Sequence, residues 1–125
     1  MEKWAGTHQE SDLDDYAWTD QNSGEEPHPV GEKKPNRLGL FDMSGNVWEW
    51  IADWYDPDYY KTSPRIDPQG PNRSWDHSRV IRGGSWISRP EHVRSSLRAR
   101  AIASVKGNLG FRLVVFPQNF TQDRQ

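Results

Sequence analysis

A run of alternating tryptophans, VWEWIADWY at residues 47–55, constrains this chain more than any other feature. One parity of the run holds Trp48, Trp50, Ala52 and Trp54. A period of two places successive side chains on opposite faces of a β-strand, whereas a helix would scatter the rings around its axis. The run therefore predicts a strand that is buried mainly on its tryptophan side.

The rest of the chain is polar and poor in aliphatic residues. Only 33% of its 125 residues are hydrophobic, and the mean hydropathy is -1.02, values that alone are typical of disordered chains. Seven Trp, four Tyr and four Phe nevertheless supply large, rigid side chains that can be buried. A chain of this length has room for one core. We therefore expect a single domain that folds around aromatic residues.

Long loops dominate the expected structure. Residues 18–36 and 56–78 are dense in Gly, Pro, Asn and Asp, which is turn chemistry. Short strands are predicted at RVIRGGSW (79–86), VRSSLRARA (93–101) and LGFRLVVF (109–116). The fold class expected is α+β with little regular secondary structure, short antiparallel strands and long ordered loops.

The two ends of the chain are expected to lie outside the core. Residues 1–15 are polar and acidic without periodicity, and we predict that this N-terminal segment contributes little to the core. Residues 117–125 are predicted to be a flexible tail.

Composition and the missing motifs exclude several functions. The net charge of -2 and pI near 6.1 indicate neither a nucleic-acid nor a membrane partner. The absence of cysteine removes disulfides, thiolate metal sites and cysteine nucleophiles. The four histidines are isolated, and no catalytic serine or phosphate-loop motif is present. Because no signal peptide or transmembrane run is seen, we expect a cytoplasmic protein.

Three blocks carry a family resemblance: HPVGEKKPNRLGLFDMSGNVWEW (28–50), RVIRGGSW (79–86) and NLGFRLV (108–114). In order and spacing they resemble the formylglycine-generating enzyme (sulfatase-modifying factor) family. The resemblance implies an elaborated C-type-lectin-like fold over residues 16–116, the C-terminal part of the family domain. Family members normally carry a further segment before the first block. We therefore expect either a minimal version or a layer completed by another copy or a partner subunit.

The resemblance also implies a calcium site in the turn before the tryptophan strand. Its ligands would be the side chains of Asp42 and Glu49 and the backbone carbonyls of Gly45 and Val47. Calcium binds six to eight hard oxygen donors, so this set is chemically suitable. The alternative is that Asp42 caps the turn and Glu49 pairs with an arginine. A second family calcium site would fall near residues 20–26, where the match fails, and we do not expect it.

The catalytic residues of the family do not carry over. Oxidase members bind copper through two cysteines shortly after the second block, and this chain has Ser88 and Val93 at the corresponding positions. Copper(I) prefers soft sulfur ligands, which serine and valine lack. We therefore expect no copper and no catalytic residue, and we lean toward a protein that is not an enzyme.

The segment 86–106 is the expected binding face of a non-catalytic, calcium-stabilised, lectin-like module. Arginines concentrate here and could pair with a protein or a small anionic ligand. Its predicted ligand-binding residues are Trp86, Ser88, Arg89, His92, Arg94, Arg98 and Arg100. The arrangement also resembles retroelement-diversified binding proteins, although those segments are rich in asparagine and this one is not.

Three alternatives stay open at this point. Arg82 and Arg112 could be structural, bonding loop carbonyls together with Asp53 and Glu49. The chain could be a formylglycine-generating oxidoreductase whose metal site is non-standard or completed by a partner. It could also be a structural subunit of an assembly, such as a homo-oligomer.

Overall fold

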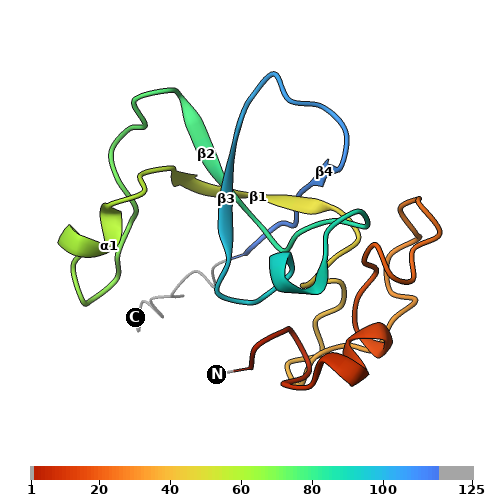
Figure 1. Ribbon diagram of the computed structural model, residues 1–125. Helices are drawn as coiled ribbons and strands as arrows, with labels where there is room; N and C mark the ends of the chain where they lie inside the picture. The colour runs from red at the N-terminus through yellow and green to blue at the C-terminus, as the bar shows by residue number, and fades with distance from the viewer. Residues whose placement is uncertain (1, 116–125) are drawn as a thin grey trace, which may run out of the picture.

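The computed structural model describes residues 2–115, and its centre is a four-stranded mixed sheet with strand order β3-β2-β1-β4 (Figure 1). The strands are β1 (Trp48–Trp54), β2 (Ser78–Arg82), β3 (Arg98–Ile102) and β4 (Leu109–Gly110). Helical structure is limited to the 3-10 helices η1 (Glu10–Asp15) and η2 (Pro90–His92) and the one-turn helix α1 (Tyr59–Thr62). The expected small share of regular structure is thus observed in the described part of the chain. The predicted tail, 117–125, lies outside it.

The predicted tryptophan strand is confirmed as β1, one of the two central strands. It pairs antiparallel with β2, where Glu49 faces Arg82, and β2 pairs antiparallel with β3. The expectation of antiparallel strands is wrong for β4, which runs parallel to β1. After β3 the chain crosses to the other edge of the sheet through residues 103–108, and this crossover brings it back in the direction of β1.

The strand predicted at 109–116 is much shorter than expected. Only Leu109 and Gly110 pair with β1. Beyond them the Arg112 side chain turns back to Glu49, and residues 111–115 leave the sheet. Their apolar sequence favours a strand, but no neighbouring strand is present for them within residues 2–115.

The most deeply buried apolar cluster is not on the tryptophan strand. Trp48, Trp50 and Trp54 are only half-buried, so burial of the tryptophan side is incomplete. The largest buried residues belong instead to a cluster of Trp4, Leu13, Ala17 and Val93. The prediction that residues 1–15 contribute little to the core is therefore wrong. Two large apolar side chains in an otherwise polar segment are enough to fold it onto η2.

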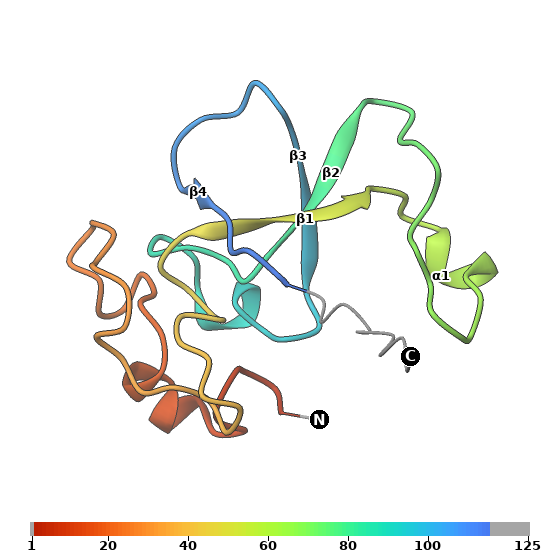
Figure 2. The ribbon, with the colours of Figure 1, turned by 180° about the vertical axis from the view of Figure 1, so that it is seen from behind.

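Trp4 anchors this N-terminal segment. Its ring is 1% exposed, and its indole Nε1 donates a hydrogen bond to the carbonyl oxygen of Pro90 at 2.7 Å. Figure 2 shows the N-terminal loops gathered at one end of the sheet and the loop with α1 extending from the other. None of the helices in the described residues is long and apolar enough to cross a membrane.

Candidate functional site

The turn that leads into β1 is held against the loop of residues 18–28. Gly45 adopts φ +76°, and a Cβ there would lie 2.1 Å from the Trp18 carbonyl oxygen, so this position requires glycine. The Asn46 side chain exchanges two hydrogen bonds with the backbone of His28, at 2.9 and 3.0 Å. The His28 ring stacks on Trp18 with 3.6 Å between ring centroids. The contacts of Gly45 with Trp18 and of Asn46 with His28 therefore hold the backbone of this turn against the loop.

The two carboxylates of the turn have different surroundings. Asp42 is buried; its Oδ2 accepts a hydrogen bond from the Gly31 amide at 2.8 Å, while its Oδ1 has no partner among the described residues. Glu49 accepts from Arg112 through both oxygens, at 2.6 Å from Nε and 2.5 Å from Nη2. This bidentate hydrogen bonding raises the pKa of Arg112. The arginine partner that we offered as the alternative for Glu49 is confirmed.

The predicted calcium ligands are therefore only partly available. Asp42 fits a cation, because a buried carboxylate oxygen without a partner is unfavourable and an ion would satisfy it. Glu49 does not fit while Arg112 occupies both of its oxygens. The guanidinium also donates to the Phe41 carbonyl at 3.1 Å, so it acts as a positive partner for the turn. Calcium coordination by Asp42, Gly45, Val47 and Glu49 stays a prediction.

The positions that correspond to the copper ligands hold no soft donor. Ser88 is buried, and its hydroxyl accepts a hydrogen bond from the Ser85 amide at 3.0 Å. Val93 is fully buried in the cluster with Trp4 and Leu13. A valine packed in an apolar core and a serine bonded to its own turn do not fit copper.

A hollow of about 430 Å³ lies where the segment after β2 meets β3 and β4. Three predicted ligand-binding residues, Ser88, His92 and Arg100, line it together. Its apolar wall consists of Trp48, Ile81, Ile87, Ala101, Val105 and Leu109. Trp86 does not line the hollow, but it contacts a residue that does. Its Nε1 donates a hydrogen bond to Asn108 Oδ1 at 2.6 Å, and Asn108 lines the hollow. Sequence reasoning missed Asn108, although it opens the NLGFRLV block.

The structure separates the remaining predicted residues from this hollow. Arg94 and Arg98 line a different, larger groove, and Arg89 is exposed and lines neither. Arg98 donates to the Asp56 carbonyl at 2.8 Å and lies 4.4 Å from the Tyr60 ring centroid, so it holds the loop after β1. The seven predicted residues therefore do not form one site.

Arg100 lines the hollow, but its guanidinium lies at a polar turn of residues 74–78. Its guanidinium pairs with Asp76 at 2.8 Å. Hydrogen bonds from the Ser74 and Ser78 hydroxyls lower the pKa of Asp76 to about 2, with a smaller contribution from Arg100. The Arg100 guanidinium therefore lies with Asp76 and the Tyr55 ring, on the face of β3 that also carries Arg98, and not in the hollow.

The arginines of the family blocks are structural, as the alternative stated. Arg82 donates to the Ser95 carbonyl and Arg112 pairs with Glu49. The expected bond to Asp53 is not among the hydrogen bonds of the described residues. Both guanidinium groups line the larger groove, of about 1000 Å³, whose apolar wall includes Leu38, Met43, Trp50, Trp54, Val80, Leu113 and Val114. The sequence did not indicate this groove.

A family pattern and similar known proteins show the family of this chain. The sequence pattern described as "Sulfatase-modifying factor enzyme 1-like domain" matches residues 1–116. A formylglycine-generating enzyme of Streptomyces coelicolor is 42% identical over 99 residues, which cover 73% of this chain and 31% of that protein. The chain thus spans about a third of the length of such curated relatives.

Solved structures support the same assignment. Treponema denticola variable protein 1 superposes with a TM-score of 0.81 at 39% identity, covering 89% of this chain and 40% of that one. PvdO from Pseudomonas aeruginosa gives 0.65 at 31% identity, covering 78% and 38%. The expected α+β, C-type-lectin-like fold is confirmed. The chain belongs to the sulfatase-modifying factor enzyme 1-like domain family.

Proposed function

We propose that this chain is a non-catalytic binding module of its family, with its ligand site in the hollow lined by Ser88, His92 and Arg100. The observation that carries the proposal is a hollow with an apolar wall that is also lined by polar residues, among them His92 and Asn108. A volume of about 430 Å³ lies within the roughly 300–1,000 Å³ range of small-molecule sites. Few polar groups on an apolar wall are the usual composition of such sites.

The chemistry of the hollow favours a small organic anion with an apolar body. Trp48, Ile81 and Leu109 offer a surface for the apolar part. His92 and the Asn108 side-chain amide line the hollow and can donate hydrogen bonds, since Asn108 uses its Oδ1 for Trp86. A carboxylate that reaches them would accept hydrogen bonds strengthened by its negative charge. We therefore propose an aromatic or branched carboxylate as the ligand class.

Benzoate is a suitable probe, with benzamide as a neutral control of the same shape. We expect benzoate to shift the NMR signals of residues around the hollow and benzamide to bind more weakly. His92→Ala should weaken benzoate binding about tenfold, the effect of losing one hydrogen bond to a charged group. Arg89→Ala should leave the affinity unchanged, because Arg89 is exposed and lies outside the hollow. Equal binding of both probes, or no effect of His92→Ala, would contradict the proposal.

A second candidate is supported by the relatives named formylglycine-generating enzymes, 42% and 40% identical to this chain. It would require a partner to supply the soft metal ligands that Ser88 and Val93 do not. The test is incubation with a cysteine-containing sulfatase-type peptide, copper and oxygen, followed by mass spectrometry. Formation of an aldehyde by the purified chain would refute the non-catalytic proposal.

We also propose that a calcium ion stabilises the turn at Asp42, and the unpartnered Oδ1 supports this. Calcium should raise the melting temperature of the wild-type chain, and a chelator should reverse the rise. Glu49→Ala is a poor test because it also breaks the pair with Arg112. Asp42→Asn is sharper, since the amide oxygen can still accept from Gly31 but the negative charge is lost. A melting temperature of the wild-type chain that does not respond to calcium would overturn this proposal.

A further inference from the structure

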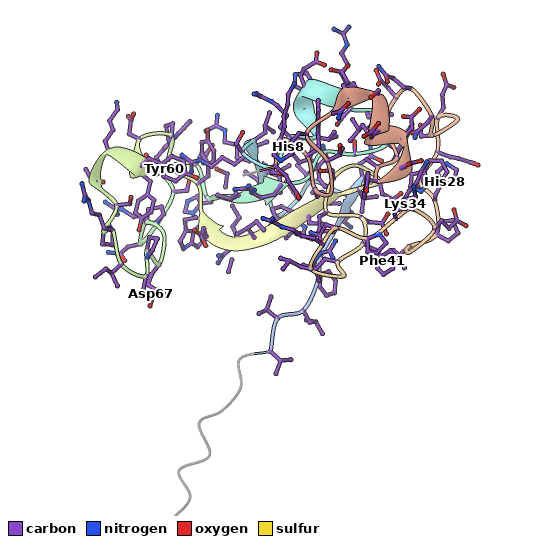
Figure 3. All side chains as sticks on the ribbon, turned by 90° about the horizontal axis from the view of Figure 1, so that it is seen from below. His8, His28, Lys34, Phe41, Tyr60 and Asp67 are labelled. Atoms are coloured by element: carbon purple, nitrogen blue, oxygen red, sulfur yellow. The ribbon has the colours of Figure 1, made fainter. Side chains whose placement is uncertain are left out.

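Residues 111–115, which we name the C-terminal arm, expose four large apolar side chains. Phe111 is 72% exposed, Leu113 86%, Val114 71% and Val115 88%. The backbone of residues 112–115 makes no hydrogen bond to another described residue. In Figure 3 the blue end of the ribbon leaves the body of the molecule as an extended segment. Side chains of this type favour a β-strand, so the arm has strand-forming sequence and lacks a neighbouring strand.

The arm is also electrically neutral at its base. Its one charged residue, Arg112, is turned back and neutralised by Glu49. Two copies of the arm can therefore approach each other without repulsion between like charges. The same property disfavours a highly charged partner.

The base of the arm borders the larger groove. Leu113 and Val114 are among its lining residues, as is Leu38, which is 76% exposed. At about 1000 Å³ the groove is at the upper limit of small-molecule sites, which suits a polypeptide segment better than a metabolite. The groove that the arm borders is also lined by Met43 and Trp50, so a strand added beside the arm would lie near further apolar side chains.

We propose that this surface is a self-association site, in which the arms of two copies of this chain pair as antiparallel strands across a two-fold axis near Leu113. Such an interface is self-complementary. Leu38 and the four apolar arm residues, each at least 71% exposed, carry about 250–450 Å² of apolar surface per chain, taking roughly 60–120 Å² for each Leu, Val or Phe side chain. A stable interface covers roughly 800 Å² per partner, so the groove residues must supply the rest.

The first test measures the mass of the full chain in solution by light scattering at several concentrations. We expect twice the 14.5 kDa of one chain. Leu113→Asp should yield a monomer with an unchanged circular dichroism spectrum, because an 86% exposed side chain contributes little to the fold of one copy. Its melting temperature should be independent of concentration, whereas that of the wild-type dimer should rise with concentration. Ile66→Asp is the matched control, since Ile66 is 87% exposed and lies in the loop after α1, so this variant should remain a dimer. A wild-type monomer at every concentration would overturn the proposal.

The absence of cysteine makes a second test straightforward. Single cysteines placed at each of residues 111–115 report the register, since paired antiparallel strands bring opposite Cα atoms to about 4.5–5.5 Å, within disulfide reach. We expect oxidation to crosslink Leu113→Cys at least tenfold faster than Ile66→Cys. Equal rates at the two positions would refute arm pairing. No residue of the arm lines the hollow, so Leu113→Asp should leave benzoate binding intact.

Discussion

Trp4→Ala should be the most destabilising single substitution in the N-terminal half of this chain. The ring is 1% exposed and packs in the cluster with Leu13, Ala17 and Val93. Replacing a buried tryptophan by alanine costs about 3–5 kcal/mol through lost burial and the cavity that remains. The Pro90 carbonyl also loses its partner at 2.7 Å, which adds about 1–3 kcal/mol if water does not replace it. A domain of this size has roughly 5–15 kcal/mol in total, so the loss is a large fraction.

Two companion variants separate the contributions to this loss. Trp4→Phe keeps much of the apolar surface but removes the indole donor, so about 1–3 kcal/mol should disappear through the Pro90 carbonyl and the smaller ring. Trp75→Ala is the matched control, because Trp75 is 77% exposed and should change stability by less than about 0.5 kcal/mol. Urea unfolding followed by circular dichroism gives each free energy. Equal, small losses for Trp4→Ala and Trp75→Ala would show that the N-terminal segment is not part of the folded core.

The other predictions concern backbone strain, acid stability and a loop anchor. Gly45→Ala should destabilise the fold by more than about 2 kcal/mol in urea unfolding, since its Cβ would clash with the Trp18 carbonyl. Gly39 has the same φ of +76° but open space around it, so Gly39→Ala should cost only about 1 kcal/mol. Asp76 has a depressed pKa, so its contribution is present above pH 3.8 and lost as the pH falls toward 2; Asp76→Asn should lower stability at pH 7 and flatten its pH dependence in that window. Arg98→Ala should increase proteolysis of the loop after β1, by removing its hydrogen bond to the Asp56 carbonyl, without changing the melting temperature by more than a few degrees.

Local patterns in the sequence were sufficient for the centre of the fold. The alternation from Trp48 to Trp54 is a property of the strand itself, so β1 could be predicted without knowing its neighbours. The turn before it was also predictable, because Gly45 has a backbone conformation that suits glycine. The candidate site was less predictable. Ser88 and His92 lie outside the strands, and the hollow that they line with Ile81 and Ala101 exists only because β2 pairs with β3. The same register places Arg98 and Arg100 on one face of β3, which the sequence alone could not relate to the hollow.

Non-local partners explain what the sequence did not reveal. Trp4 lies in a polar segment without periodicity, and its burial depends on Pro90, 86 residues further along the chain. The length of the last strand depends in the same way on a partner. Residues 111–115 have the composition of a strand, but a strand forms only where a neighbour accepts its hydrogen bonds.

Glu49 shows why the metal question cannot be answered by motif alone. The same carboxylate can coordinate calcium or form a bidentate ion pair with an arginine, because both partners are positive and both can bind its two oxygens. In this structure Arg112 takes that role and also donates to the Phe41 carbonyl. Calcium could recruit Glu49 only after displacing Arg112, whereas Asp42 requires no displacement. Arg112→Gln therefore separates the two possibilities: if calcium uses Glu49, this variant should show a larger calcium-induced rise in melting temperature than the wild-type chain. An equal rise would assign the ion to Asp42 alone.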